Sequence, residues 1–288
     1  MKCSDSASGY KVVKLATGVH SVHSLAFGET FHPVIGPVAE AEALYVRQLR
    51  LCERVCAPAK PFVIWDVGLG SAANVLTVLR ATKNFDCSLS MQSFDNSIDP
   101  LAFALQHTSE LNYLQGYEKL AEKFLGEGRV LFQDGKQTVE WVLHLGDFPT
   151  FISQPAAARV PKPDGVMFDA FSPATNPAMW TQQLFTNLYR LLDPRRPCAL
   201  PTYSRSTVLR VTLLLAGFFV GVGHATGEKE ETTIAANCME LIEQPLNRRW
   251  LLRACRSHSA EPLWEPVYRQ ARLSVETRDK LEHHPQFQ

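Results

Sequence analysis

The sequence lacks an excess of either charge, a paired-cysteine motif and a long apolar run. Lys plus Arg equal Asp plus Glu at 29 each, so bulk charge does not identify a nucleic-acid binder, although a locally basic face remains open. The seven cysteines are scattered, odd in number and without a CxxC pair, which disfavours a disulfide framework or a metal site. No apolar run reaches membrane-spanning length, and the start lacks the apolar core of a signal peptide. We therefore expect a soluble, cytoplasmic protein that holds no metal and contacts no membrane.

Strand-like and helix-like segments alternate from Pro61 onward. Five apolar runs predict strands, and helical patterns fall between them, which is typical of a parallel sheet covered by helices on both faces. Two further strand-like runs, joined by the polar turn TGEKEE, predict a terminal antiparallel hairpin. The expected strands are 62–68, 89–95, 129–134, 165–171, 198–204, 218–225 and 232–239, and the expected helices are 71–82, one opened by Asp99-Pro100, 136–145, 178–192 and 205–216.

Segments of different character flank this alternating region. Residues 10–34 alternate as strands do, with Thr17-Gly18 at a hairpin turn, and 38–57 show apolar residues at helical spacing. Residues 245–288 are charged and proline-containing and predict a partly ordered tail. The expected organisation is an N-terminal hairpin and helix extension (1–57), a core (58–240) and a C-terminal extension (241–288).

Acidic residues stand where three of the expected strands end. Ligands of open parallel sheets bind beyond the carboxyl ends of the strands. The first strand closes with Asp66 and a turn in which Gly68 and Gly70 let the backbone approach a ligand. Asp95 closes the second strand, where a carboxylate can accept both hydroxyls of a ribose, and Asp134 closes the third, where it can accept from an exocyclic amine. Each acid alone also fits a helix cap or a turn.

The glycine turn and the second acid fit either a dinucleotide or S-adenosylmethionine. A dinucleotide site usually has a third glycine for close helix packing, and here Ala72 or Ala73 occupies that position. An alanine is tolerable there, so this position hardly distinguishes the two cofactors. The third acid, Asp134, disfavours a pyrophosphate because of charge repulsion. The residues therefore favour S-adenosylmethionine over NAD.

A carboxylate followed by an aromatic and proline-rich loop closes the fourth strand. Asp169 precedes a loop whose rigid apolar wall would hold a substrate beside it. In that setting the carboxylate could bind an amine, help remove its proton and orient the lone pair for attack on a methyl group. The alternative is a capping aspartate before core aromatics. The candidate substrate-binding residues of the loop are Phe171, Pro173, Asn176 and Trp180, and Tyr203 after the fifth strand lines the pocket or packs there.

Several motifs between about residues 20 and 237 resemble one bacterial family. The string FDAFSPATNPAMWTQQLFTNLYRLLDP closely resembles the methyltransferase domain of the bifunctional enzyme that makes 5-methylaminomethyl-2-thiouridine at the tRNA wobble position. The turn GLGSAANVL is similar to the family's glycine turn, with Asn74 in a matching place. Gly36 and Glu40 match a G-x-x-x-E stretch that begins a helix, and GEKEETTIA resembles the final hairpin.

The resemblance implies a Rossmann-like class I methyltransferase with a mostly parallel, seven-stranded sheet. It implies S-adenosylmethionine binding by Asp66, Gly68, Gly70, Asn74, Asp95, Asp134 and Asp169, with Asp169 catalytic at the aminomethyl group of a tRNA uridine. The family's bifunctional members add a flavin-dependent oxidase domain of several hundred residues, which we do not expect in these 288 residues. We therefore expect a stand-alone methyltransferase, for which a separate enzyme would supply the aminomethyl uridine.

Two other functions remain open at this point. The same chemistry could act on a small amine, or the fold could be a non-catalytic adenosyl-binding scaffold, which the Asp169 loop disfavours. Three histidines lie in the N-terminal hairpin region, His20, His23 and His32. Their spacing could indicate a metal site or a catalytic base, but the alternating pattern favours partly exposed positions on strands. The sequence leaves the oligomeric state open, and a cluster of arginines predicts either an RNA-binding patch or a solvated face: Arg205, Arg210, Arg248, Arg249, Arg253 and Arg256.

Overall fold

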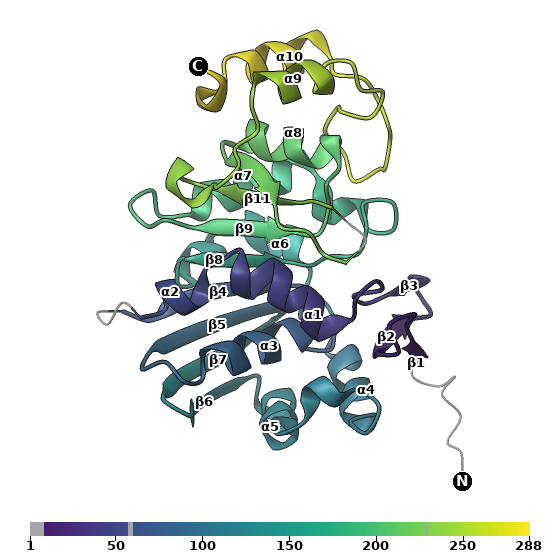
Figure 1. Cartoon of the computed structure of the whole chain (residues 1–288), viewed down its shortest axis with the longest axis vertical. Coiled ribbons are helices and arrows are strands. Elements are labelled where there is room, and N and C mark those ends of the chain that lie inside the picture. Colours follow the sequence, from purple (N-terminus) through teal and green to yellow (C-terminus); the bar gives the residue numbers. More distant parts are fainter. Residues whose placement is uncertain (1–8, 57–59, 228–229) are drawn as a thin grey trace. The chain divides into compact units, whose positions relative to one another are not determined.

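The computed structural model describes residues 9–56, 60–227 and 230–288. Two compact units share the chain: unit 1 takes in the described residues of 1–147, 167–169 and 225–230, and unit 2 the others. Strand β8 (Gly165–Phe168) contributes its first half to unit 2 and its second half to unit 1. In the described ranges the main sheet has eight strands, in the order β10-β11-β9-β8-β4-β5-β7-β6 (Figure 1). The division into 1–57, 58–240 and 241–288 stays a prediction.

Unit 1 begins with the expected hairpin. Strands β1 (Tyr10–Lys14) and β2 (His20–Ser24) pair antiparallel around the Thr17-Gly18 turn, and β3 (Glu29–Thr30) extends this small sheet. The expected helix 38–57 is helical but broken, because Arg50 adopts a left-handed conformation with φ of 52°. Residue 57 lies outside the described residues. The pieces are α1 (Pro37–Ala41), the π-helix η2 (Glu42–Arg47) and α2 (Leu51–Arg54).

The centre of unit 1 is the predicted pair of parallel strands. Strand β4 (Phe62–Val67) is buried at every position, which explains its unbroken apolar sequence. It pairs in parallel with β5 (Ser88–Asp95), and α3 (Ala73–Thr82) connects the two. After β5 follow α4 (Asp99–Gln106), η3 (Asn112–Leu114) and α5 (Glu118–Glu127), and Pro100 lies in the first turn of α4, where its missing N–H costs nothing.

The third expected strand and the helix expected after it are corrected by the structure. Strand β6 (Arg129–Asp134) is an antiparallel edge strand, and residues 137–145 form strand β7 (Gln137–Leu145) instead of a helix. Strand β7, not β6, runs parallel to β5. The Asp134-Gly135 turn and the alternating burial of Gln137, Val139 and Trp141 are the signals of a hairpin. The main sheet therefore has eight strands rather than seven.

Unit 2 contains the other strands of the main sheet. The short strand β9 (Ala199–Thr202) is parallel to β8, and β10 (Phe219–Gly223) and β11 (Thr232–Ala236) form the predicted antiparallel hairpin. Its helices include the predicted ones near 178–192 and 205–216. They are α6 (Phe148–Ser153), η4 (Pro155–Arg159), η5 (Pro177–Trp180), α7 (Gln182–Leu191), α8 (Thr207–Ala216) and η6 (Met239–Leu241).

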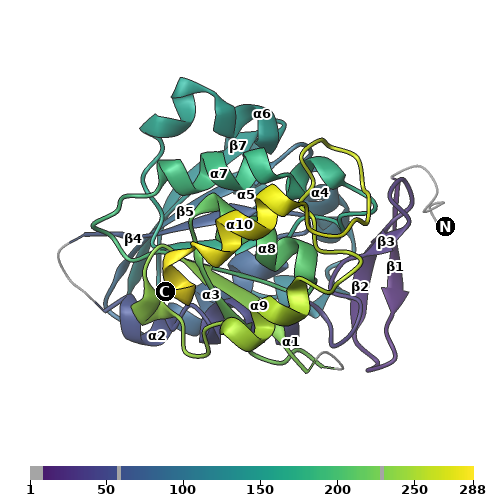
Figure 2. The same ribbon diagram turned by 90° about the horizontal axis from the view of Figure 1, so that it is seen from above.

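The C-terminal segment is more ordered than its composition suggested. It forms α9 (Arg248–Ala254), α10 (Val275–Glu282) and η7 (Pro285–Phe287), and α10 packs on α8 (Figure 2). Asn247 and Ser274 cap the two α-helices by accepting hydrogen bonds from Trp250 N and Thr277 N. None of the helices within the described ranges is long and apolar enough to cross a membrane.

The β6–β7 turn generates a stability prediction. Gly135 has φ of 62°, and a Cβ there would lie 2.4 Å from the backbone oxygen of Lys83. We expect Gly135→Ala to lower the free energy of unfolding by about 3 kcal/mol, measured by urea titration. Gly128→Ala is the matched control, since Gly128 has φ of 67° but a Cβ added there would meet no described atom within 4 Å, and it should cost only about 1 kcal/mol. Equal losses in the two variants would contradict the steric argument.

Candidate functional site

Three parallel strands of unit 1 end at the same edge of the sheet. Val67 of β4 is level with Phe94 of β5, and Asp95 is level with Leu145 of β7. The chain leaves β4 through Gly68, whose N–H donates to the carbonyl of Phe94 over 2.9 Å. Residues that directly follow β4, β5 and β7 therefore lie together, at the edge where open parallel sheets bind ligands.

The glycine turn after β4 is hydrogen-bonded to Asp95, the last residue of β5. Gly68 and Gly70 have φ of 95° and 52°, in the left-handed region that favours glycine. Gly70 N–H donates to Asp95 Oδ2 over 2.9 Å, and Ser97 N–H donates to Oδ1 over 3.2 Å. The pKa of Asp95 is raised overall, because the effect of burial exceeds the lowering effect of these hydrogen bonds. The structure thus brings Gly68, Gly70 and Asp95 together as predicted.

Asp169 lies at the end of β8 and belongs to unit 1. Its N–H donates to the carbonyl of Val67 over 2.9 Å, which fixes it beside the end of β4. Its Oδ2 accepts a hydrogen bond of 2.8 Å from Nδ2 of Asn74 and lies 3.1 Å from Nε2 of His32. The same His32 nitrogen lies 3.1 Å from Asn74 Oδ1, so the three side chains form a closed polar triangle.

His32 is one of two residues of the candidate site that the sequence pattern does not indicate. The sequence pattern predicts a partly exposed strand residue, but the His32 side chain is only 7% exposed and the residue follows β3 with φ of 49°. Burial by itself lowers the pKa of His32, but the charge of Asp169, the hydrogen bond to it and the charge of Glu40 outweigh burial and raise this pKa to about 9. His32 is therefore an imidazolium at neutral pH and forms an ion pair with Asp169. Local periodicity carried no signal for this contact, and only the nearby Gly36 and Glu40 motif marked the segment.

Asp66 is near the triangle but has no exposed surface. Burial raises the pKa of Asp66 to about 7, the hydrogen bond from Ser93 Oγ opposes this, and the charges of Asp169 and Asp95 add to it. Its Oδ1 has no hydrogen-bond partner among the described residues. Asp66 thus links the ends of β4 and β5 from within the sheet, through its hydrogen bond with Ser93, and a role for it in cofactor binding stays a prediction.

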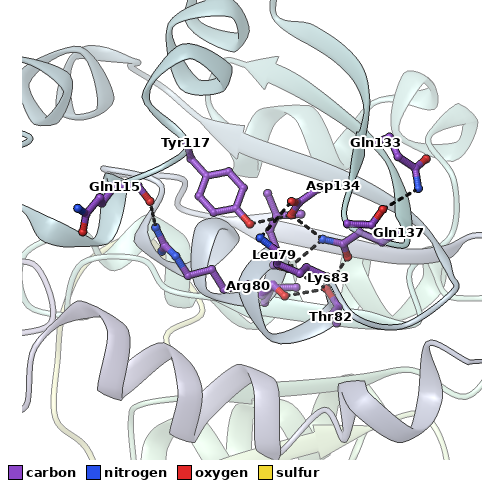
Figure 3. A network of polar contacts seen from close by, with 11 residues as sticks. Leu79, Arg80, Thr82, Lys83, Gln115, Tyr117, Gln133, Asp134 and Gln137 are labelled. Carbon is purple, nitrogen blue, oxygen red and sulfur yellow. Dashed lines mark hydrogen bonds and ion pairs between the residues drawn. The ribbon is translucent and has the colours of Figure 1, made fainter.

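Asp134 is not part of this group. It is level with Gln137 at the start of β7, whereas Asp95 is level with Leu145 at the end. At a rise of about 3.3 Å per residue, the two positions on β7 are separated by roughly 25 Å. Asp134 Oδ2 instead accepts hydrogen bonds from Tyr117 Oη (2.7 Å) and Gln137 Nε2 (2.9 Å), in a network at the opposite edge of the sheet (Figure 3). Its predicted placement beside Asp95 was wrong because β6 runs antiparallel.

The acid that does follow β7 is Asp147. The preceding Gly146 donates its N–H to the carbonyl of Asp95 over 2.8 Å, which places the exposed Asp147 at the carboxyl edge. The sequence does not point to Asp147, because the pattern of residues 136–145 predicts a helix there. Once β7 is recognised as a strand, the rule that located Asp95 also locates Asp147.

The predicted substrate loop follows Asp169 directly and lies in unit 2. Trp180 is buried and donates its indole N–H to the carbonyl of Phe171 over 2.7 Å, and Tyr203 donates to the carbonyl of Ala170 over 3.0 Å. The rings of Trp180 and Tyr203 meet edge to face at 6.0 Å. Trp180 and Tyr203 therefore hold the loop in shape, whereas Phe171, Pro173 and Asn176 remain partly exposed along it.

The His32–Asp169 pair generates a pH prediction. Because the pKa of His32 is raised above 6.5 to about 9, its stabilisation should be complete below pH 6.5 and disappear as the pH rises through 9. His32→Asn suits the left-handed backbone and should cost about 3 kcal/mol near pH 6 and progressively less toward pH 9.5, measured by urea unfolding. His23→Asn, which removes a contact to Thr30 Oγ1, is the control. A loss at His32 that did not change with pH would rule out the ion pair.

Comparisons with known proteins agree with this geometry. Residues 112–238 match the family model described as S-adenosyl-L-methionine-dependent methyltransferase. The chain is 28% identical over 225 residues to the tRNA 5-methylaminomethyl-2-thiouridine biosynthesis bifunctional protein MnmC of Pseudomonas putida, covering 73% of this chain and 32% of that protein.

A solved structure gives the same result for the fold. The crystal structure of MNMC2 from Aquifex aeolicus superposes with a TM-score of 0.70 at 22% identity, covering 96% of this chain and 85% of that one. The predicted fold class is confirmed, with eight strands in the main sheet in place of seven, and the predicted cofactor is confirmed. Over residues 112–238 the chain is thus similar to S-adenosyl-L-methionine-dependent methyltransferases, and over 73% of its length to about a third of MnmC.

Proposed function

We propose that the protein methylates the aminomethyl group of 5-aminomethyl-(2-thio)uridine at the wobble position of tRNA, and that Asp169 is the residue that binds the reacting amine. The observation that carries this proposal is the triangle of Asp169, Asn74 and His32 beside the glycine turn. The similarity to MnmC, whose name states tRNA 5-methylaminomethyl-2-thiouridine biosynthesis, supports the substrate.

The residues at the carboxyl edge of unit 1 fit S-adenosylmethionine. The turn at Gly68 and Gly70 exposes backbone beside Asp95, whose carboxylate can accept two ribose hydroxyls. Asp147, in place of Asp134, follows the third parallel strand and can accept from the exocyclic amine of adenine. Asn74 closes the site on the side of α3. When bound, the cofactor supplies an electrophilic methyl group on a sulfonium.

Asp169 acts on the amine as an oriented hydrogen-bond acceptor. A primary amine can attack a methyl group only as the neutral base, with its lone pair aligned with the bond that breaks. The carboxylate accepts an N–H of the amine, and His32 and Asn74 hold the carboxylate in one orientation. The imidazolium also keeps Asp169 ionised, so that it can stabilise the positive charge that develops on the nitrogen.

The loop after Asp169 provides the surface for the uracil ring. Phe171 remains partly exposed, and its carbonyl is held by the indole of Trp180. The backbone that carries this ring is therefore held in place, and the exposed part of the ring can stack on a base. We assign Phe171, Pro173 and Asn176 to the substrate, and Trp180 and Tyr203 to holding the loop in position.

The substrate also implies a partner. Because the aminomethyl group must be present before it can be methylated, a separate activity must install or expose that amine on the uridine. We infer that this enzyme acts on the same tRNA immediately before the methyltransferase. A location in the cytoplasm, where such tRNAs are modified, is part of this proposal.

The assignment of the cofactor site is tested by matched acid-to-amide changes. We expect Asp95→Asn and Asp147→Asn each to weaken S-adenosylmethionine binding about tenfold or more, since each removes a charged acceptor. Asp134→Asn should leave the affinity unchanged because Asp134 belongs to the network at the other edge. Isothermal titration calorimetry measures all three. Weakening by Asp134→Asn alone would reverse the assignment.

The reaction itself is tested with labelled methyl groups. Purified protein should transfer label from S-adenosylmethionine to bulk tRNA from a strain that lacks the methylation step, and the label should appear in 5-methylaminomethyl uridine. Asp169→Asn should lower turnover about 100-fold or more while the affinity for the cofactor changes little. Cofactor binding without label in tRNA would move the substrate to a small amine. Normal turnover by the variant would remove Asp169 from catalysis.

A further inference from the structure

Helix α9 and the residues after it, up to 272, carry an unusual charge pattern. Residues 248–272 contain six arginines, two glutamates and no lysine, although the chain as a whole is neutral. Helix α10 is different, because its charges pair with each other as Lys280–Glu276 and Arg278–Glu282. Positive charge is therefore concentrated in the segment that begins with α9.

Most of these arginines have no acidic partner in the described part of the protein. Arg249, Arg253 and Arg256 follow one another at spacings of four and three, opposite the buried Trp250 and Leu251. Together with Arg269 they are exposed, and their side chains make no hydrogen bond or ion pair in the part of the chain that the structure describes. Exposed arginines without acidic neighbours produce a positive potential that attracts anions.

Two arginines predicted to belong to the patch have other roles. Arg210 is buried, and its guanidinium contacts Glu231, Thr232 O and Thr233 Oγ1. Arg248 donates to the carbonyl of Phe287 over 2.8 Å. The positive charges of Arg253 and Arg205 nevertheless reach Arg210 and contribute, after burial, to lowering its pKa. Arg205, which follows β9, thus lies within electrostatic range of the same cluster as Arg253.

Exposed aromatic rings accompany the arginines. Trp264 and Tyr268 are 53% and 41% exposed. The indole N–H of Trp264 donates to Glu261 Oε1 over 2.9 Å, and Glu261 accepts further hydrogen bonds from Ser274 and Thr277 at the start of α10. The Trp264 ring is therefore fixed in orientation while half of it faces solvent, an arrangement suited to stacking.

The same segment returns to the candidate substrate loop within unit 2. Leu263 forms a bridge with Thr181, and Gln182 N–H donates to the carbonyl of Leu263 over 2.8 Å. Thr181 directly follows Trp180, the residue that holds Phe171. Leu263, the residue before the exposed Trp264, therefore contacts the backbone at the end of the substrate loop.

We propose that residues 248–272 form a docking surface for the single-stranded loop of a folded RNA, in which Arg249, Arg253 and Arg256 contact phosphates and Trp264 stacks on a base. Arginine suits this role because its fork binds phosphate oxygens and its plane stacks on bases. The inference rests on the proposed function and adds the surface by which the tRNA is held.

The test measures binding of a fluorescein-labelled anticodon stem–loop RNA to the full chain by anisotropy over a range of salt concentrations. The triple variant Arg249→Gln/Arg253→Gln/Arg256→Gln should lose about tenfold in affinity at about 0.1 M salt, with the slope of log K against log salt reduced by about 2. Trp264→Ala should lose about fivefold for the stem–loop and nothing for a blunt RNA duplex. The control Arg278→Gln/Lys280→Gln removes charge from self-paired α10 and should bind as the wild type does.

The outcomes separate this inference from the proposed function. If the triple variant and Trp264→Ala both bind the RNA and methylate tRNA as the wild type does, the docking surface is overturned and the proposed function is left intact. A wild-type protein that binds no RNA but methylates free 5-aminomethyluridine would overturn the tRNA substrate and the surface with it. Loss of binding to phosphatidylserine vesicles, with RNA binding unchanged, would reassign the arginines to a membrane. The inference is supported if both variants lose tRNA binding while they methylate the free nucleoside normally.

Discussion

The ion pair between Asp169 and His32 is the contact on which the candidate site depends. A carboxylate that is largely removed from water at a sheet edge is costly unless a charge and hydrogen bonds compensate for it. His32 comes from the segment after the N-terminal hairpin, and Asn74 comes from the start of α3, yet both meet one oxygen of Asp169. The segment after the N-terminal hairpin is thus part of the candidate site, because it carries the charge that holds the acid ionised and oriented.

The sequence was sufficient to predict the buried parallel strands and the acids that follow them. Strands such as β4 are covered on both faces, so burial imposes an apolar residue at nearly every position and the pattern is unambiguous. The position of Asp95 and Asp169 then follows from sheet geometry alone. Strand β7 was not predicted because one of its faces is partly exposed, and its mixed pattern of polar and apolar residues also fits a helix. That single error moved Asp134 to the wrong edge and concealed Asp147.

The role of His32 could not be predicted from local pattern in the same way. Alternation in the hairpin suggests which residues share a face, but His32 lies after β3, where the backbone is left-handed and the alternation has ended. Burial lowers its pKa, and the net rise comes from Asp169 and Glu40, which lie far along the chain or in another element. Contacts of this kind depend on how elements pack, which residue spacing does not encode.

A neutral chain and an RNA substrate are compatible because charge acts locally. At physiological salt, exposed charges more than about 8 Å apart are largely screened, so an approaching phosphate responds to the nearest side chains rather than to the net charge. In α10 the glutamates lie within salt-bridge distance of Arg278 and Lys280, so the positive potential at the surface of this helix is small. Along α9 the described arginines have no such neighbours, and the one glutamate that anchors Trp264 is occupied by hydrogen bonds to Ser274 and Thr277. Where the acids are placed, rather than how many there are, therefore determines which surface of this protein can bind a polyanion.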